Sequence, residues 1–424
     1  MGAGADPSAR FVEVAAEHAR CFWLDGGGAR SWSGRRSLIG WLDDDDLSLS
    51  YDAATATVRA HRGDASEVVG TDIFEVLDRY LELDRLAAQG SDADSVHWVG
   101  YFGYASRPDL PARVDPGDPA PTAVWMRTRH VEFYRHEVSE AAAPASVAEP
   151  TEVATPADYQ AGFDRVQEHL HAGNSYEVNL THREPVDEAL EPLDTYLRLR
   201  QLNPAPYAGF LQHNGGWLLS SSPERFATVD ADGWVETKPI KGTTPRGDTP
   251  AEDEAHRVRL AQDAKYRAEN LMIVDLLRND LAMVCEPGSV EVPVLMEVES
   301  YRSVHQLVST VRGQLRAEFS TLAALRALFP AGSMTGAPKL RTMEIIAEVE
   351  NSARGAYSGA FGWIASDGRA DLGVIIRSIS GGTDLLGRRR WQLGTGGGIT
   401  VGSDAAEEYA ETQWKAALLR RALG

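Results

Sequence analysis

Cysteine is almost absent from this 424-residue sequence, which contains only Cys21 and Cys285. The two residues lie far apart, and neither belongs to a CxxC or Cys/His pattern. A disulfide framework and a zinc site are therefore not expected, and a reducing compartment fits the composition.

Long apolar runs are also missing. No stretch approaches the roughly 20 apolar residues that a membrane-spanning helix needs. The N-terminal sequence MGAGADPSARFVEV lacks a basic region followed by an apolar one. The sequence therefore predicts a cytoplasmic protein without a membrane segment.

Positive charge is in deficit, because 42 Lys and Arg residues face 62 Asp and Glu residues and give a formal net charge of -20. A nucleic acid has to be met by a basic patch, and the sequence contains no such cluster, so no nucleic-acid ligand is expected. A small anionic substrate is compatible with this charge, because a local pocket can be cationic on an acidic protein.

The remaining composition is that of an ordinary globular protein, with 43% hydrophobic and 25% charged residues. The chain is longer than a single core usually grows, so two cores or one composite core are expected. The segment EAAAPASVAEPTEVATP has no apolar period and predicts a linker over 141–155. This linker would separate an N-terminal region, 1–140, from a larger region, 156–424.

The periodicity predicts an α+β chain with antiparallel sheets rather than a βαβ array. Short strand patterns occur in the first region at CFWLDGGG, SLIGWL, LSLSYD, ATVRAH and HWVGYFGYA. In the second region, YAGFLQH and WLLSSS flank Asn214, Gly215 and Gly216, which accept the positive φ of a hairpin turn. Helices are expected between Pro156 and Gly173, over 252–282, from near Thr335, and from about 403 to 423.

Lys241, in the segment PIKGTTPRG, is a candidate functional residue. The segments PERFATVD and WVETKPIKG flank a turn, and if Asp230 faces Trp234 then Glu224 lies opposite Ile240. Glu224 and Lys241 would then be close enough to share a site. A surface Glu/Lys pair across the hairpin explains the same pattern.

Three glutamates are candidate ligands of a hard cation. Glu269 lies on the apolar side of its helix, where a buried carboxylate needs a partner. Glu408 and Glu411 are three residues apart and share one face of the last helix. Carboxylates from two helices would suit Mg²⁺. The spacing of Glu411 and Lys415 is equally that of a routine helical ion pair.

Two glycine-rich segments, GTGGGI (394–399) and AGSMTGAP (331–338), could offer backbone N–H groups to a carboxylate or a phosphate before a helix. Neither contains GKS, GKT or a strand-bound GxGxxG, so a nucleotide site is only weakly indicated. Arg377 lies in the apolar segment GVIIRSIS and needs an anionic partner, either a ligand carboxylate or a structural Asp or Glu.

Taken in order, SPERF, PIKGTTPRG, RAENLMIVDLLRNDL, SVHQLVST, GSMTGAPK, GTGGGI and EEYAETQWKA resemble the chorismate-binding enzymes over about 155–420. The N-terminal region matches more loosely, through FWLD and WVGYFGY. The resemblance implies an anthranilate-synthase component I type sandwich of two large antiparallel sheets with flanking helices. It also implies an active site between the sheets and a requirement for Mg²⁺.

The resemblance further implies a role for single residues. Glu269, Glu408 and Glu411 would hold Mg²⁺ on the ring carboxylate of chorismate, with the choice of direct ligand between the last two left open. Tyr357, Arg377, Thr243, Thr335, Gly396, Gly397 and Gly398 would bind the substrate. Glu224 would protonate the departing C4 hydroxyl, and His305 would line the site near the ring.

Two positions separate the reactions within the family. Anthranilate synthases resemble this chain in the segment around position 241 but have PIAGT there, with alanine in place of the lysine. Isochorismate and salicylate synthases place a lysine base at position 177. This chain has Lys241 and Glu177. The combination resembles the branch that makes aminodeoxychorismate, in which the lysine attacks C2 and ammonia then adds at C4. This chemistry requires the pKa of Lys241 to fall from about 10.4, which burial and the charge of Mg²⁺ would supply.

The resemblance implies two substrates, chorismate and ammonia, and a separate glutamine amidotransferase subunit as the ammonia source, because neither cysteine lies in a nucleophile context. The product would serve p-aminobenzoate and folate biosynthesis or an antibiotic pathway. Anthranilate synthase is the alternative within the family, since one substitution separates the two. A non-catalytic glycine-loop nucleotide-binding protein is the alternative from another class.

Overall fold

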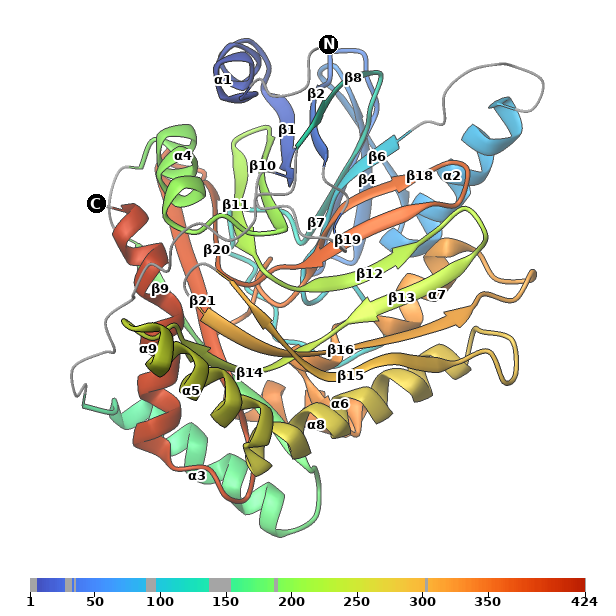
Figure 1. Cartoon of the computed structure of the whole chain (residues 1–424). Helices are drawn as coiled ribbons and strands as arrows, with labels where there is room; N and C mark the ends of the chain where they lie inside the picture. The colour runs from blue at the N-terminus through green and yellow to red at the C-terminus, as the bar shows by residue number, and fades with distance from the viewer. Residues whose placement is uncertain are drawn as a thin grey trace.

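The structure is a computed structural model that describes residues 6–26, 33, 36–88, 97–136, 154–186, 190–301 and 304–423. Within these residues the chain folds into two large antiparallel sheets with flanking helices (Figure 1). This arrangement confirms the predicted fold class.

The first sheet has nine strands among the described residues, in the spatial order β17-β9-β21-β20-β11-β10-β1-β2-β8. Its strands are β1 (Arg20–Asp25), β2 (Arg36–Trp41), β8 (His130–Arg135), β9 (Glu177–Val186), β10 (Tyr207–His213), β11 (Gly216–Ser222), β17 (Gly336–Ala337), β20 (Ser378–Thr383) and β21 (Arg389–Ile399).

The second sheet has twelve strands within the same described residues, in the order β14-β16-β13-β12-β19-β18-β6-β7-β3-β4-β5, and β15 pairs with β16 outside this path. Its strands are β3 (Ser48–Asp52), β4 (Thr57–Arg62), β5 (Ala65–Gly70), β6 (His97–Phe102), β7 (Ala123–Arg127), β12 (Arg225–Val229), β13 (Trp234–Lys238), β14 (Ile240–Pro245), β15 (Glu291–Ser300), β16 (Val304–Gln314), β18 (Ala360–Ala365) and β19 (Ala370–Val374).

Successive side chains of a strand point to opposite faces of its sheet, and this alternation explains what each face packs against. In β1, Phe22 and Leu24 pack between the sheets against residues of β6 and β7, whereas Trp23 packs on the other face of the first sheet. That outer face is covered by α1 (Ser8–Glu17), α4 (Pro192–Leu202) and α9 (Ala405–Leu423). The outer face of the second sheet is covered by α2 (Ile73–Ala88), α6 (Ala264–Ala282) and α7 (Thr321–Leu328). Both faces of the central strands are therefore buried, whereas β5, β8 and β15 at the margins of the sheets keep exposed polar positions.

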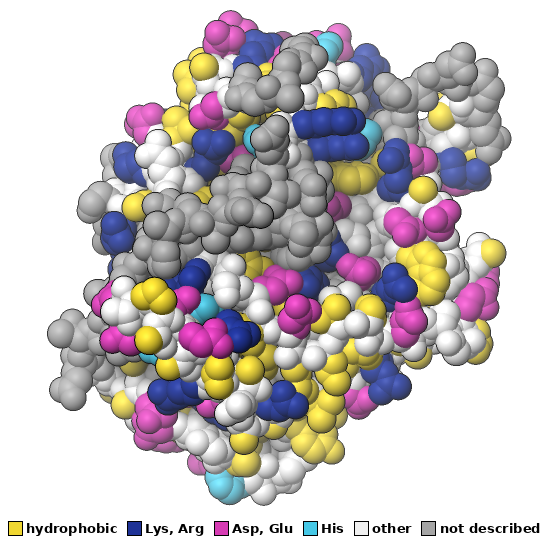
Figure 2. Space-filling view, viewed as in Figure 1, with side chains coloured by type: hydrophobic (Ala, Val, Ile, Leu, Met, Phe, Trp, Pro, Cys, Tyr) yellow, Lys and Arg dark blue, Asp and Glu magenta, His cyan; other side chains and the backbone are white. Residues whose placement is uncertain are grey.

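The remaining helices lie near the ends of the two sheets. Helices α3 (Ala157–His171) and α8 (Lys339–Val349) pack against β9, and α5 (Pro250–Gln262) packs against β14, β15 and β16. None of the described helices is long and apolar enough to cross a membrane. On the face shown in Figure 2, acidic and basic side chains of the described residues alternate rather than gather by sign.

Both sheets combine strands from the two sides of the predicted linker, since β1 pairs with β10 and β6 pairs with β18. The chain therefore forms one composite sandwich. The linker expected over 141–155 lies almost wholly outside the described residues, so this boundary stays a prediction.

Local sequence features explain where the helices and turns begin. The hairpin turn is confirmed at Asn214 and Gly215, which have φ of 47° and 82°. The single helix expected over 252–282 is wrong, because Asp263 ends α5 and caps α6 by accepting bonds from Lys265 N and Tyr266 N. The helix expected near Thr335 begins only at Lys339, after a short 3-10 turn and β17.

Candidate active site

A polar cavity lies where β9 and β21 of the first sheet meet β14 and β16 of the second. Its walls also include residues of α6, of α9 and of the segment before β17. It is lined by Asn179, Pro223, Glu224, Ile240, Lys241, Gly242, Thr243, Lys265, Tyr266, Glu269, Gln306, Ser333, Met334, Tyr357, Ile376, Arg377, Gly394, Thr395, Gly396, Gly397, Gly398, Glu408, Glu411 and Lys415. The predicted site residues are thus largely brought together.

A bulge in β14 directs Lys241 into this cavity. The pairing of β14 with β16 shifts by one position between Ile240 and Thr243. Gly242 lies inside the shift with a φ of 101°, and its Cα faces the ring of Tyr266 so closely that a Cβ would stand 2.9 Å from it. An L residue with a side chain would be strained there. The glycine after Lys241 therefore allows the local turn of the chain.

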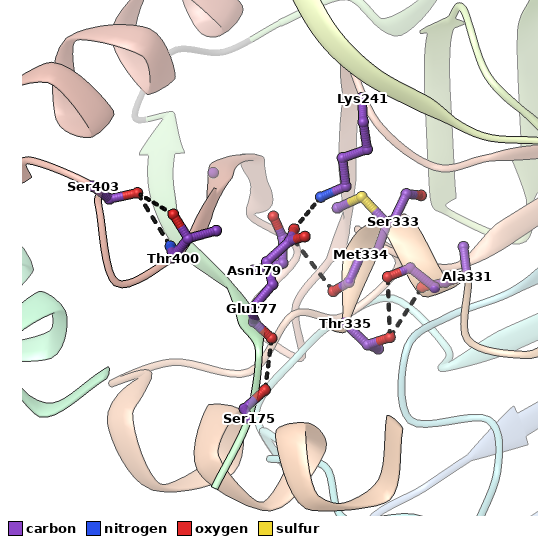
Figure 3. A network of polar contacts seen from close by, with 12 residues as sticks. Ser175, Glu177, Asn179, Lys241, Ala331, Ser333, Met334, Thr335, Thr400 and Ser403 are labelled. Atoms are coloured by element: carbon purple, nitrogen blue, oxygen red, sulfur yellow. Dashed lines mark hydrogen bonds and ion pairs between the residues drawn. The ribbon is translucent and has the colours of Figure 1, made fainter. Parts of the chain in front are cut away.

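Lys241 Nζ donates a short hydrogen bond to Glu177 Oε1, and the two side chains are only 8% and 0% exposed. The residues point toward each other from β14 and β9 (Figure 3). Burial acts to lower the pKa of Lys241, but the charges of Glu177 and Glu269 outweigh it and hold this pKa above its ordinary value. Burial alone therefore does not lower the pKa of Lys241 in the ligand-free protein, and the fall expected with Mg²⁺ stays a prediction.

Glu224 is a buried carboxyl with a raised pKa. Burial raises the pKa of Glu224 to about 7, although the hydroxyl of Ser333 donates a 2.6 Å bond to its Oε1 atom. The N–H of Ile240 also contributes a hydrogen bond that favours the ionised form. A carboxyl with a pKa near neutrality can carry a proton and release it at physiological pH.

The predicted strand pairing of Glu224 with Ile240 is wrong. Val229 pairs with Val235 as expected, but a bulge moves Arg225 opposite Lys238. After Pro239 the chain leaves β12 and pairs with β16 instead. Glu224, just before β12, and Lys241, in β14, thus face the same cavity from segments that do not pair with each other.

The three candidate cation ligands all line the cavity. Glu269 is buried, its Oε1 atom has no hydrogen-bond partner among the described residues, and burial raises the pKa of Glu269 to about 8. Glu408 accepts bonds of 2.6 Å from Lys265 Nζ and from Ser403 Oγ. Burial and the charge of Glu411 raise the pKa of Glu408.

Glu411 forms an ion pair of 2.6 Å with Lys415, as the helical spacing alone predicts. Burial acts to raise the pKa of Glu411, but Lys415 and the other lysines hold it below its ordinary value. Within the described chain, only Asp43, Asp46 and His130 bring three possible ligand atoms within 4.8 Å of one another. The three cavity glutamates are therefore spread more widely and are balanced by lysines.

Arg377 and Tyr357 lie at the side of the cavity formed by β21. Arg377 is not in a strand as expected but in the connection between β19 and β20, with a φ of 51°. Burial lowers the pKa of Arg377 to about 10, and its guanidinium stands 5.8 Å from the ring centroid of Trp414. No ion pair of this guanidinium occurs among the described residues, which leaves it available to an anionic ligand.

The segment GTGGGI is part of β21 rather than a loop that precedes a helix. Its backbone is paired with β9, with Gly396, Gly397 and Gly398 opposite Thr181, Leu180 and Asn179. These glycines make room for side chains, because a Cβ on Gly398 would stand 2.3 Å from Glu177 Oε1 and 3.1 Å from Lys241 Nζ. The segment 394–399 therefore does not form the loop that a nucleotide site would need.

Thr243 lines the cavity as expected, but the structure brings neither His305 nor Thr335 to its walls. Thr335 Oγ1 is buried and donates to the carbonyls of Ala331 and Gly332. The ring of His305 bonds Ser300 Oγ at 2.8 Å and Asp253 Oδ1 at 3.0 Å. Both residues therefore have structural contacts outside the cavity.

Gln306 takes the position in the cavity that was expected for His305. Successive residues of a strand point to opposite faces, so the neighbour of His305 on β16 faces the cavity. Gln306 Oε1 is buried and has no hydrogen-bond partner among the described residues. Alternation places His305 and Gln306 on opposite faces, but it does not show which face lines the cavity, because both faces of β16 are buried.

Other cavity residues were also missed by the sequence analysis. They are Asn179, Lys265, Ser333 and Lys415, together with Glu177 as the partner of Lys241. Lys265 stands four residues before Glu269 on one helix, a spacing that indicates a shared face. Ser333 gave no local signal, because its contact with Glu224 spans 109 residues of sequence.

A buried arginine fixes two walls of the cavity. Arg354 donates to the carbonyls of Met334 at 2.6 Å and Asn179 at 2.8 Å, and it forms an ion pair of 2.7 Å with Glu350. Asn179 Nδ2 also donates to the carbonyl of Met334, as Figure 3 shows. The segments that carry Glu177 and Ser333 are thereby held at a fixed separation.

Comparison with known proteins gives consistent matches. The profile of the chorismate binding enzyme family matches residues 20–421. A protein of Streptomyces pristinaespiralis named aminodeoxychorismate synthase is 38% identical, over 97% of this chain and 63% of its own length. Aminodeoxychorismate synthase component 1 of Escherichia coli K12 is 45% identical, over 60% of this chain and 55% of its own length. The chain thus spans about three fifths of these curated relatives.

Two solved structures share the fold. Anthranilate synthase component I of Streptococcus pneumoniae has a TM-score of 0.73 and 24% identity, over 92% of this chain and 93% of its own. A putative 2,3-dihydroxybenzoate-specific isochorismate synthase of Bacillus anthracis has a TM-score of 0.71 and 18% identity, over 98% and 99%. At these identities the likeness concerns the fold alone.

Proposed function

Because the chain belongs to the chorismate-binding enzyme family, we propose that it converts chorismate and ammonia to 4-amino-4-deoxychorismate, the reaction of an aminodeoxychorismate synthase. The observation that carries this proposal is the buried amine of Lys241, which faces the same cavity as the protonatable Glu224. The names of the curated relatives support the same reaction.

The proposed route uses Lys241 as a nucleophile. Lys241 Nζ bonds to C2 of chorismate while the ring double bonds shift and the C4–O bond breaks. Glu224 gives its proton to the leaving hydroxyl, so water departs. Ammonia then bonds to C4, the double bonds shift back, and the C2–N bond breaks with its electron pair returning to Lys241. The covalent step transfers the site of amination from C2 to C4.

The proposal assigns Glu269, Glu408 and Glu411 to a hard divalent cation such as Mg²⁺. The unpartnered Oε1 of Glu269 and the all-carboxylate donor set fit such an ion. When bound, the ion would supply positive charge to the ring carboxylate of chorismate. Lys265 and Lys415 balance the charge of Glu408 and Glu411 in the ligand-free protein.

Arg377, Tyr357 and Thr243 are proposed to hold the substrate. The unpaired guanidinium of Arg377 suits a carboxylate of chorismate. Tyr357 is packed so closely on Gly394 that a Cβ there would stand 2.2 Å from the ring. The ring of Tyr357 therefore has a fixed position from which to orient the ligand.

We assign the supply of ammonia to a separate glutamine amidotransferase subunit. Both cysteines of this chain are buried, and burial raises the pKa of Cys21 to about 12 and that of Cys285 to about 11. A glutaminase needs a nucleophilic thiolate, which such thiols do not provide. Free ammonium is the substitute in the absence of this subunit.

The test is incubation with chorismate, Mg²⁺ and ammonium, followed by identification of the product by mass and fluorescence. An amine at C4 that retains the enolpyruvyl group is expected. Anthranilate as the main product would favour the other aminating branch of the family, and isochorismate would favour water as the nucleophile. Either outcome contradicts the proposal.

Two variants test the nucleophile. Lys241→Ala removes the amine, and Lys241→Arg keeps a positive charge beside Glu177 without a usable nucleophile. Both are expected to stop formation of the C4 amine, while Lys241→Arg keeps the unfolding temperature of the wild type. Formation of the C4 amine at the wild-type rate by either variant would show that Lys241 is not the nucleophile.

A further inference from the structure

The proposed function leaves one requirement unmet, and the inference drawn here rests on that function. Lys241 must attack as a neutral amine, yet its pKa is held above the ordinary value by surrounding carboxylates. The structure therefore has to contain a group that accepts the proton of Lys241 Nζ before attack.

Three carboxylates face Lys241 from the elements packed around it, namely Glu177 of β9, Glu224 before β12 and Glu269 of α6. Glu224 has its own task as the proton donor and is hydrogen-bonded to Ser333. Glu269 acts on Lys241 through its charge, without a hydrogen bond to Nζ. Of the described residues, only Glu177 contacts Lys241 Nζ.

We infer that Glu177 is a further catalytic residue of this enzyme, the base that takes the proton from Lys241 Nζ. Its Oε1 atom already accepts the hydrogen bond along which the proton moves. Its Oε2 atom is buried and has no partner among the described residues. Within the described parts of the chain, Lys241 is the cation that forms an ion pair with this carboxylate, so the Oε2 atom is available to share the added proton.

The transfer suits a site from which the bound substrate excludes water. Moving the proton turns a buried ion pair into two neutral groups and leaves the net charge unchanged. Isolated charges are costly away from water, so exclusion of water by the bound substrate favours the neutral pair. In the ligand-free protein, the surrounding carboxylates hold the pKa of Lys241 above its ordinary value, so its amine is charged.

The proton balance closes over one turnover. Glu177 first takes a proton from Lys241, and the freed electron pair forms the bond to C2 while Glu224 protonates the departing hydroxyl. Ammonia then adds at C4, and its excess proton restores Glu224. Lys241 leaves C2 as a neutral amine and regains its proton from Glu177. The sum is chorismate plus ammonia giving the amine plus water.

Gly398 provides independent geometric support. A Cβ at this position would lie 2.3 Å from Glu177 Oε1 and 3.1 Å from Lys241 Nζ, so only glycine leaves space for the pair. Arg354 anchors the same wall through the carbonyl of Asn179. The fold thus holds the side chains of Glu177 and Lys241 in contact.

The experiment measures the covalent step without ammonia. Wild-type protein is mixed with chorismate and Mg²⁺, and growth of a Lys241 adduct with the mass of chorismate less water is followed by intact-protein and peptide mass spectrometry. Glu177→Gln keeps the shape and the hydrogen-bond acceptor but removes the base. The adduct is expected to form about 10²- to 10⁴-fold more slowly in this variant near neutral pH.

The pH dependence separates a base from a merely structural contact. Above about pH 7, loss of the Glu224 proton lowers the adduct rate of the wild type and of Glu177→Gln alike. In Glu177→Gln solvent must also remove the proton of Lys241, so the ratio of the variant rate to the wild-type rate is expected to rise about tenfold per pH unit between about pH 7 and 9. Glu177→Asp keeps a carboxylate and is expected to recover most of the lost rate at neutral pH.

A matched control is Glu184→Gln on the same strand, whose carboxylate pairs with Arg420 away from the cavity. It is expected to form the adduct at the wild-type rate. If a folded Glu177→Gln variant formed the adduct with the wild-type rate and pH profile, this inference would be overturned but the proposed function would not. Equal rates for Glu177→Gln and Glu177→Asp would have the same consequence. A wild-type protein that forms neither the adduct nor the C4 amine would overturn the proposed function and this inference together.

Discussion

The hydroxyl of Ser333 lies 2.6 Å from the Oε1 atom of Glu224 and donates a hydrogen bond to it. This bond stabilises the ionised carboxylate, whereas burial stabilises the protonated form and raises the pKa of Glu224 to about 7. The two effects set the pH at which Glu224 can still deliver a proton.

Removing this hydroxyl is expected to shift the pH profile upward. Glu224 acts while it is protonated, so the rate falls as pH rises through its pKa. Ser333→Ala removes a bond that favours ionisation, and the pKa therefore rises further, by about one unit. The pH dependence of adduct formation without ammonia measures this. A falling limb at the same pH in both proteins would show that the contact does not tune Glu224.

A methyl group at position 398 is expected to disrupt the site without unfolding the protein. Gly398→Ala places an atom against Glu177 and Lys241, whose flexible ends can yield. We expect a loss of roughly 10²-fold in the adduct rate, since small misplacements of reacting groups are costly. Gly402→Ala is the control, because its Cβ would meet nothing within 4 Å. Equal losses in the two variants would exclude a specific effect.

Glu269→Gln is expected to weaken Mg²⁺ binding at least about tenfold, as judged by calorimetry on the ligand-free protein. The unfolding temperature is expected to stay the same or rise, because the carboxylate is buried with an unpartnered oxygen. Glu407→Gln changes an exposed carboxylate beside the pair on α9 and serves as the control. If both variants bind Mg²⁺ like the wild type, Glu269 is not a ligand.

His305 and Gln306 are neighbours on β16 with opposite expected effects. His305→Ala removes two hydrogen bonds of a buried ring and is expected to lower the free energy of unfolding by about 1–3 kcal/mol, with kcat little changed. Gln306→Met removes an amide that faces the cavity and is expected to change KM or kcat while stability is kept. Chemical denaturation and steady-state kinetics distinguish them, and the reverse pattern would contradict the assignment.

The sequence predicted elements well where one local pattern decides the structure. The Asn214 and Gly215 turn and the last helix are of this kind, since turn residues and helical spacing act over a few positions. The bulge in β12 lies in its pairing with the distant strand β19 as well as with β13, and β14 pairs with β16, which comes much later in the sequence. Long-range pairing of this kind leaves no mark in the local pattern.

The candidate site shows the same difference between features that a local pattern decides and features that long-range contacts decide. Glu269, Glu408 and Glu411 could be found because helix spacing fixes their face. Choosing between His305 and Gln306 needed the face of a strand, which the apolar segment around them does not reveal, because both faces of that strand are buried. The segment 394–399 was expected to be a loop because glycine favours loops, but backbone pairing with β9 makes it a strand.

The order of the strands also governs how the protein is made. β1 pairs with β2 and β6 pairs with β7, but the second partner of each, β10 and β18, comes much later in the sequence. Until that partner has been translated, one edge of each strand is unpaired, and such edges are prone to aggregation. Because β21 and α9 supply residues of the cavity, the cavity can form only after both segments have been translated.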